Sequence, residues 1–209
     1  MLSIFLYKAI QYPFDIYLLL CFFNRYDNKI IMEIKRKVSF QEYSEGIEKL
    51  AIMISDSGFM PSHIISIARG GLRVGDILSR LFRVRSSYLG VESYEIAEKG
   101  KVSDRQQNEV IFSRDISSTT QDFGNNILIA DDLVDSGKSL IFSLKFLAAY
   151  KPFKGKNINF KTAVLYKKPS SKISPDYVAH EMTTNDWLIF FYEENELISI
   201  SDLKKKYNK

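Results

Sequence analysis

Apolar residues along the chain follow two patterns, helical spacing and short uninterrupted runs. A stripe of apolar residues at helical spacing predicts a helix over Phe40–Ile54. The runs His63–Ala68 and Ile127–Ala130 have the length and the isoleucine content of buried strands. The same patterns predict helices at Leu72–Phe82 and Ser139–Tyr150, strands at Val84–Val91 and Asn157–Tyr166, and two further apolar segments at Asp176–Glu181 and Trp187–Tyr192.

Strand and helix alternate through the middle of the chain. This order predicts right-handed βαβ units, and therefore an α/β fold with a mainly parallel sheet flanked by helices. Ligands of such sheets bind beyond the carboxyl ends of the strands, where we expect the loops Arg69–Leu72 and Asp131–Ser139. One segment interrupts the pattern: Glu92–Phe123 is polar, and only Val110–Phe112 resembles a strand. Segments of this length inside a compact domain are usually functional or mobile.

The first 31 residues differ from the rest in being apolar and aromatic. The run Ile16–Phe23 is too short to span a bilayer, and Asn24–Asp27 does not resemble a signal-peptide cleavage site. We interpret Met1–Ile31 as an extension that precedes the true start at Met32, with residues 32–209 as the functional domain. The alternative is that the extension anchors the protein to a membrane surface or binds a partner.

The composition is that of an ordinary globular protein. The chain has 209 residues, with 29 Lys and Arg against 25 Asp and Glu, and a net charge of +4. This mild basicity suits an anionic small molecule. The sequence has no dense basic stripe with interleaved aromatics, so it does not predict nucleic-acid binding. The single cysteine, Cys21, excludes an intrachain disulfide and a Cys-rich zinc site, so we expect a reducing, cytoplasmic location. His63 and His180 stand far apart in the sequence and are expected to be structural.

Three carboxylates and a loop suited to phosphate follow the most apolar predicted strand. Asp131 and Asp132 end that strand, and Asp135 and Ser136–Ser139 lead into the next helix. Backbone N–H groups at a helix start cradle phosphate, whereas paired carboxylates suit sugar hydroxyls or a divalent metal. A sugar phosphate presents both kinds of group. A nucleoside triphosphate loop would need a glycine where Asp132 stands, and a simple helix cap would leave the third carboxylate unexplained.

The segment Asn126–Leu140 resembles the signature of type I phosphoribosyltransferases. This resemblance implies the fold of that family with a small C-terminal hood, phosphoribosyl pyrophosphate (PRPP) as the donor, and Mg2+ as the cofactor. It implies that Asp131 and Asp132 bind the ribose hydroxyls, that Asp132 also contributes to the metal site, and that Asp135 is the catalytic base. The implied 5-phosphate loop consists of Asp135, Ser136, Gly137, Lys138 and Ser139.

A second segment, Ile67–Leu72, resembles the pyrophosphate loop of xanthine–guanine phosphoribosyltransferases. In that family the loop contains a cis peptide bond. Arg69 would supply forked donors to an anion, and Gly70 and Gly71 would free backbone N–H groups. A plain Gly-Gly turn is the alternative. Ser93-Tyr94 resembles the pair at the root of a mobile loop in purine enzymes, which makes Glu92–Phe123 either a candidate lid or a simple insertion.

The C-terminal part resembles the base-binding region of 6-oxopurine enzymes. Lys168 matches the lysine that binds the exocyclic oxygen in xanthine–guanine enzymes, and Lys167 matches the hypoxanthine–guanine pattern. The same resemblance implies that Trp187 stacks on the purine, that Leu188 offers backbone groups to it, and that Glu193 helps to bind the magnesium–pyrophosphate. Surface lysines and a core tryptophan are the alternatives.

Together these resemblances predict transfer of the phosphoribosyl group from PRPP to guanine, xanthine or hypoxanthine, in purine salvage. Lys138 replaces a glycine of the xanthine–guanine loop, and Phe191–Glu193 replaces the Pro-Trp-Asp ending, which leaves the preferred base open. A PRPP-binding regulator without catalysis and a transferase that acts on another base are alternatives. The expected partners are PRPP, a purine base and further copies of the chain, with no nucleic acid or membrane.

Overall fold

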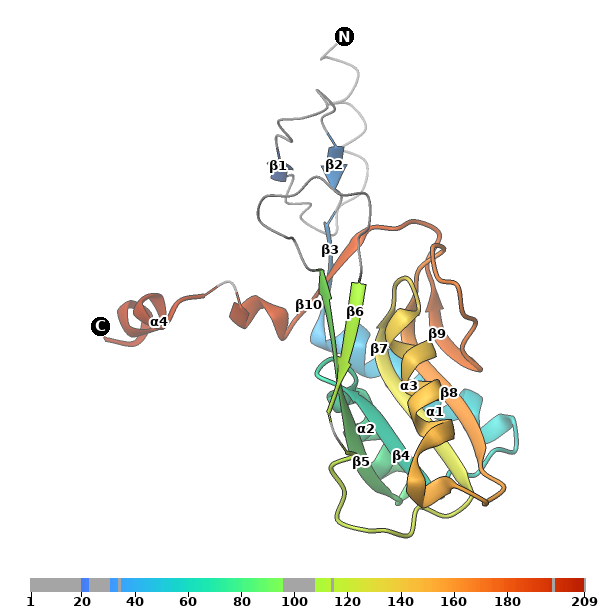
Figure 1. Ribbon diagram of the computed structural model, residues 1–209. Coiled ribbons are helices and arrows are strands. Elements are labelled where there is room, and N and C mark those ends of the chain that lie inside the picture. Colours follow the sequence, from blue (N-terminus) through green and yellow to red (C-terminus); the bar gives the residue numbers. More distant parts are fainter. Residues whose placement is uncertain are drawn as a thin grey trace. The chain divides into compact units, whose positions relative to one another are not determined.

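Figure 1 shows the protein as a computed structural model, which describes residues 20–22, 31–33, 35–95, 108–113, 115–196 and 198–208. The chain divides into two compact units. One is Tyr43–Asn185, and the other combines Met1–Glu42 with Asp186–Lys209.

The larger unit is built on a six-stranded sheet in the order β6-β5-β4-β7-β8-β9. The five strands other than β6 are parallel to one another, and β6 runs antiparallel to β5. This arrangement confirms the predicted α/β fold with a mainly parallel sheet. The strands are β4 (His63–Ala68), β5 (Arg85–Glu95), β6 (Asn108–Phe112), β7 (Asn126–Val134), β8 (Asn159–Lys167) and β9 (Tyr177–Glu181).

Helices cover both faces of this sheet (Figure 1). The helix α3 (Lys138–Ala149) buries Leu140 and Leu147 in one apolar cluster with Ile65, Ile129 and Val164 of the central strands. The helices α1 (Phe40–Asp56) and α2 (Gly71–Phe82) lie on the other face. There, glycines of both helices approach side chains of the sheet closely: Gly46 of α1 approaches Leu165, and Gly75 of α2 approaches Ser66. Successive strand residues point to opposite faces, so both faces of the central strands can be apolar.

Two strands extend further than the apolar runs predict. β7 continues through Asp131–Val134, which the sequence pattern assigned to a loop, because the backbone pairing with β8 continues as far as Val134↔Lys167. β5 extends to Glu95 and pairs with β6, so the start of the candidate lid Glu92–Phe123 is a strand hairpin. Residues 96–107 and 114 of that candidate lid lie outside the described residues.

The smaller unit contains two strand pairs and a short C-terminal helix. β3 (Lys35–Val38) pairs in parallel with β10 (Trp187–Phe190), and β1 (Leu20–Phe22) pairs antiparallel with β2 (Ile31–Glu33). The chain ends in α4 (Ile200–Tyr207), which buries none of its residues and which the Ser199 side chain caps. The described residues also form the 3₁₀ turns η2 (Lys151–Phe153) in the larger unit and η3 (Glu193–Glu196) in the smaller one.

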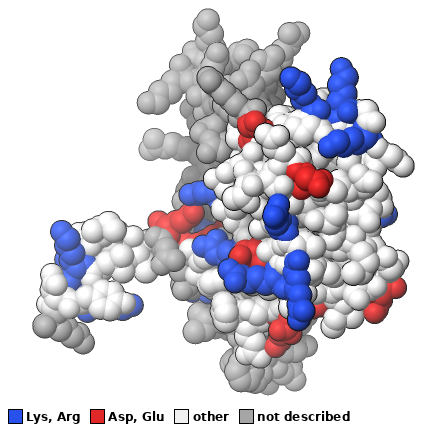
Figure 2. Space-filling model, turned by 90° about the horizontal axis from the view of Figure 1, so that it is seen from below, with Lys and Arg blue, Asp and Glu red and all other residues white. Residues whose placement is uncertain are grey.

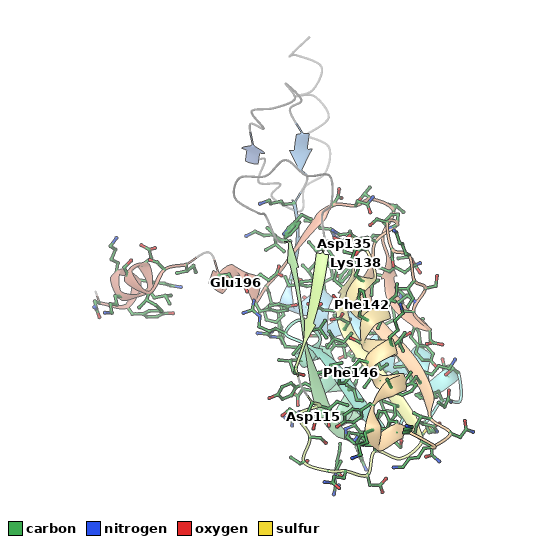
Figure 3. All side chains as sticks on the ribbon, in the orientation of Figure 1. Asp115, Asp135, Lys138, Phe142, Phe146 and Glu196 are labelled. Atoms are coloured by element: carbon green, nitrogen blue, oxygen red, sulfur yellow. The ribbon has the colours of Figure 1, made fainter. Side chains whose placement is uncertain are left out.

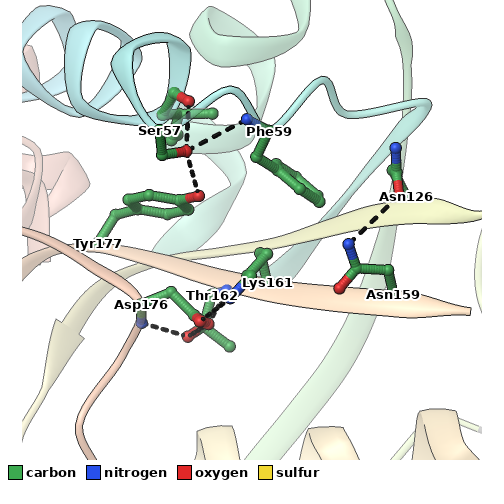
Figure 4. A network of polar contacts seen from close by, with 9 residues as sticks. Ser57, Phe59, Asn126, Asn159, Lys161, Thr162, Asp176 and Tyr177 are labelled. Carbon is green, nitrogen blue, oxygen red and sulfur yellow. Dashed lines mark hydrogen bonds and ion pairs between the residues drawn. The ribbon is translucent and has the colours of Figure 1, made fainter.

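The amino-terminal edge of the sheet is fixed by a network of polar contacts (Figure 4). The Asp176 carboxylate accepts from Lys161 Nζ and from the Thr162 hydroxyl, each at 2.8 Å. At the end of α1, the Ser57 and Tyr177 hydroxyls lie 2.7 Å apart. These contacts hold α1 and the starts of β8 and β9 together, at the opposite end of the sheet from the predicted loops.

Surface charge gives no support for a nucleic-acid interface on the face that Figure 2 shows. In the described part of this face, Lys and Arg stand in small groups with Asp and Glu among them, and no continuous basic stripe crosses it. Among the described residues, no helix combines the length and the apolar character that crossing a membrane would require.

Candidate functional site

The two loops that the sequence singled out meet at the carboxyl ends of β4 and β7. These strands are parallel neighbours, with Ser66 opposite Ala130. Directly after β4, the backbone of Gly71 lies so close to β7 that a Cβ atom there would be 2.5 Å from the Ala130 carbonyl oxygen. A Cβ atom at Gly70 would overlap the Asp132 carboxylate. The loop that starts at Arg69 and the acid pair on β7 therefore form one continuous surface.

The loop after β4 has the backbone form that the resemblance implied. The Ala68–Arg69 peptide bond is cis, and Leu72 N donates to Arg69 O at 3.2 Å. The helix α2 starts at Gly71, so its first backbone N–H groups open next to the acid pair. Such groups, together with the exposed Arg69, form a set of donors suited to an anion.

The acid pair consists of a buried carboxylate and a half-buried one. Asp131 is 7% exposed, and its Oδ1 accepts from the backbone N–H of Asp132 at 3.0 Å. Burial, followed by the neighbouring charge of Asp132, raises the pKa of Asp131 well above its ordinary value. Asp131 can therefore hold a proton and donate, whereas Asp132 can accept hydrogen bonds. Such a pair is suited to the hydroxyls of a sugar, which both donate and accept.

The loop after β7 has the form of a phosphate cradle. Gly137 has a φ of +82°, which side chains rarely adopt, and a Cβ atom there would lie 2.6 Å from Ile173 Cγ2. As the residue before α3, Gly137 offers no side chain to cap the first turn. The first N–H groups of α3 can therefore donate to a phosphate oxygen. Lys138 starts the helix and lies at the same end of it as Asp135 (Figure 3).

Asp135 is held by two side chains from the segment that follows β8. Lys168 Nζ donates to Asp135 Oδ2 at 2.8 Å, and Ser170 Oγ donates to Oδ1 at 3.2 Å. The lysine is 5% exposed, so its charge is compensated by this carboxylate. Lys167, the other candidate, instead pairs with Glu181 at 3.2 Å. No sequence pattern indicates the contact between Lys168 and Asp135, and Ser170 was not among the predicted site residues.

The comparisons with known proteins agree with this geometry. Residues 39–196 match the phosphoribosyl transferase domain family. The chain belongs to this family. A xanthine–guanine phosphoribosyltransferase of Idiomarina loihiensis is 29% identical over 128 residues, which cover 61% of this chain and 68% of that protein. Its counterpart in Cereibacter sphaeroides is 31% identical over 128 residues, which cover 61% of this chain and 66% of that protein.

Solved structures show the same fold. The purine phosphoribosyltransferase of Pyrococcus horikoshii has a TM-score of 0.59 and 25% identity, and the match covers 75% of this chain and 91% of that one. The xanthine–guanine–hypoxanthine phosphoribosyltransferase of Helicobacter pylori has a TM-score of 0.64 at 24% identity, over 82% of this chain and 99% of that one. The predicted phosphoribosyltransferase fold and the predicted transferase class are thereby confirmed.

Three residues that the family resemblance assigned to the purine and metal sites belong to the smaller unit. Trp187 is 51% exposed, so the alternative of a core tryptophan is wrong. Leu188 is buried, and its backbone pairs with Arg36 of β3. Glu193 Oε2 accepts from the backbone N–H of Phe190 at 3.0 Å. Their roles toward a purine or a metal stay predictions.

The carboxylates of the larger unit fit the way in which this family would hold magnesium. Among the described residues, no group of three His, Cys, Asp or Glu side chains is arranged to bind a metal by itself. Mg2+ is commonly bound by one or two carboxylates together with water and substrate phosphates. Asp132, next to the loops that follow β4 and β7, is a carboxylate that suits a Mg2+ ion arriving with a pyrophosphate.

Proposed function

We propose that this chain transfers the 5-phosphoribosyl group of PRPP to a 6-oxopurine base and releases pyrophosphate. The observation that carries the proposal is the junction between Arg69–Gly71 and the acid pair Asp131–Asp132 on β7, with the phosphate cradle immediately after them. PRPP presents a pyrophosphate, two ribose hydroxyls and a 5-phosphate, and the three parts of this site correspond to these groups in number and chemistry.

The donor would bind across these three parts. Asp131 and Asp132 would accept from the ribose 2- and 3-hydroxyls, with the raised pKa of Asp131 allowing that group to donate in return. Backbone N–H groups and hydroxyls in the loop Ser136–Ser139 would hold the 5-phosphate. Arg69 and the backbone N–H groups around Gly70 and Gly71 would hold the pyrophosphate.

The reaction would take place at the ribose C1 atom. A nitrogen of the purine forms a bond to C1 while the bond from C1 to the pyrophosphate oxygen breaks, through a transition state that resembles an oxocarbenium ion. Asp135 would lie near the purine N7 and hold or accept its proton. A bound Mg2+ would neutralise charge on the leaving pyrophosphate. Asp132 and Glu193 are the protein side chains that we propose would help to hold this Mg2+.

Lys168 is the candidate selector of the base. An ammonium group donates and cannot accept, so it favours an exocyclic oxygen and disfavours the amino group of adenine. Two observations support Lys168 over Lys167: its proximity to Asp135, and the pairing of Lys167 with Glu181. The relatives named above act on xanthine, guanine or other purines by name, which supports the same class of acceptor for this chain. Trp187 and Leu188 are the proposed stacking and backbone contacts to the base.

A base panel tests this proposal. The full chain is incubated with PRPP, Mg2+ and one base at a time from guanine, xanthine, hypoxanthine, adenine and uracil, and pyrophosphate release is followed. We expect release with at least one 6-oxopurine and none with adenine. No release with any of the five bases would overturn the enzyme proposal, and release with adenine or uracil alone would overturn the acceptor. The proposal includes a cytoplasmic role in purine salvage. It also includes self-association, which size-exclusion chromatography with light scattering would test.

A further inference from the structure

The segment after β8 does more than supply a lysine for the base. Lys168–Ile173 lies along the loop that follows β7, where Lys168 N donates to Val134 O at 3.0 Å and Lys172 N donates to Ser136 O at 3.2 Å. The two segments therefore remain paired beyond the ends of their strands. Asp135 lies between these two backbone contacts, so the segment after β8 determines which donors its carboxylate can reach.

The contacts of Asp135 divide evenly between its two oxygens. Lys168 occupies Oδ2 and Ser170 occupies Oδ1. The Asp135 side chain is 54% exposed, so packing alone does not fix the plane of its carboxylate. In the proposed reaction, Lys168 also has to donate to the exocyclic oxygen of the purine. Its contact with Asp135 is then shared or lost, whereas the contact from Ser170 makes no demand on the substrate.

We infer that Ser170 is a positioning residue, which holds the carboxylate of Asp135 in its reactive orientation while Lys168 engages the base. This inference rests on the proposed function, since it concerns the same reaction. A serine hydroxyl is suited to the task because it is short and neutral. It fixes one carboxylate oxygen and leaves the other for Lys168. Reactions of this kind are sensitive to the position of the reacting group on the scale of about 1 Å.

The fold permits a clean test, because the hydroxyl is not what holds this segment in place. The backbone N–H of Ser170 donates to Asn185 Oδ1 at 3.2 Å, and Ser171 N donates to Lys168 O at 3.1 Å. Both backbone contacts survive replacement of the side chain. Ser170→Ala should therefore fold normally and lose only the contact to Asp135, and Ser170→Thr should restore a hydroxyl at the same position.

The test compares the wild type, Ser170→Ala and Ser170→Thr over a series of PRPP concentrations up to saturation, with Mg2+ and the best base from the panel. We expect kcat of Ser170→Ala to fall by about tenfold, in line with the loss of one hydrogen bond to a charged group, while KM for PRPP stays unchanged. Ser170→Thr should recover most of the lost turnover. A wild-type kcat in Ser170→Ala, or a rise in KM for PRPP with kcat unchanged, would overturn the positioning role and leave the proposed function standing.

A second measurement separates this result from failure of the proposed function. In a crystal structure of Ser170→Ala with a 6-oxopurine bound, the Asp135 carboxylate should be rotated or present in more than one conformer. One unchanged orientation would overturn the inference, whether or not the chain turns over a purine. An inactive wild type would overturn the proposed function and, with it, the catalytic meaning of this contact.

Discussion

Gly71→Ala is the substitution that best tests whether the pyrophosphate loop and the acid pair form one site. Gly71 is buried and starts α2, and its φ is not in the left-handed region, so alanine is compatible with its backbone conformation. The added methyl group would lie 2.5 Å from the carbonyl oxygen of Ala130 and 2.9 Å from Asp131 Cα. Both neighbours are backbone atoms of β7, so neither can rotate away. The loop or the strand end must then move by about 1 Å to restore normal contact.

This movement has two expected costs. Overpacking of this kind destabilises a protein by about 1–3 kcal/mol, and each kcal/mol lowers Tm by about 2–4 °C in a chain of this size. The second cost is functional, because the displaced atoms carry the pyrophosphate donors and the ribose carboxylates. A displacement of about 1 Å in such groups lowers kcat/KM for PRPP by about a hundredfold.

Gly58→Ala is the matched control. Gly58 has a φ of +75° but no atom within 4 Å of an added Cβ, so alanine there costs backbone strain of about 1–2 kcal/mol without a clash. It lies at the end of α1, at the amino-terminal edge of the sheet. Differential scanning calorimetry and PRPP-dependent kinetics on both variants should show lower Tm in both and lower kcat/KM only in Gly71→Ala. Wild-type kcat/KM in Gly71→Ala would refute the joint site.

Three further perturbations follow from individual residues. Asp135→Asn should lower kcat by about a hundredfold. The circular dichroism spectrum should stay unchanged, because the amide oxygen of the new side chain can still accept from Lys168. Normal turnover in this variant would refute the catalytic role of Asp135. Burial and the hydrogen bond to Asp115 raise the pKa of Tyr150 to about 12. Ultraviolet titration should therefore show a tyrosine that ionises near this value. Asp115→Asn should lower the pKa of this tyrosine toward the ordinary value. Burial, followed by the charge of Arg85, lowers the pKa of His63 to about 4. At this residue the unfolded chain then binds more protons between pH 6.5 and 4, so His63 contributes less to the free energy of unfolding as the pH falls through this range. Urea denaturation of the wild type and of His63→Gln should give pH profiles that differ by this contribution, and parallel profiles would contradict the assignment.

The parallel sheet could be predicted from sequence because its central strands are apolar on both faces. β4 has the bounds that its apolar run predicts, His63–Ala68. The extent of β7 could not be predicted in the same way, since its apolar run stops at Asp131 while its backbone pairing continues to Val134. β3 was missed because Lys35–Val38 is short and mostly basic, and its partner β10 lies far along the chain.

The proposed donor site was more predictable than the contacts of Asp135, the proposed catalytic carboxylate. Asp131, Asp132 and Gly137 lie within one short segment whose spacing has a chemical meaning. The contact between Asp135 and Lys168 joins residues 33 positions apart, and no local pattern indicates it. The hydroxyl of Ser170 was equally hidden, because a serine after a strand is ordinary turn chemistry. Such contacts depend on the pairing of β7 with β8, which only the folded chain reveals.

The most direct test of the proposed function is a competition among bases in one reaction. The full chain is mixed with PRPP, Mg2+ and equal concentrations of guanine, xanthine, hypoxanthine, adenine and uracil, and the nucleotides formed are identified by mass spectrometry. The account predicts the monophosphate of one or more 6-oxopurines, in amounts equal to the pyrophosphate released, and no adenine or uracil nucleotide. Formation of an adenine or uracil nucleotide instead, or of no nucleotide at all, would contradict it.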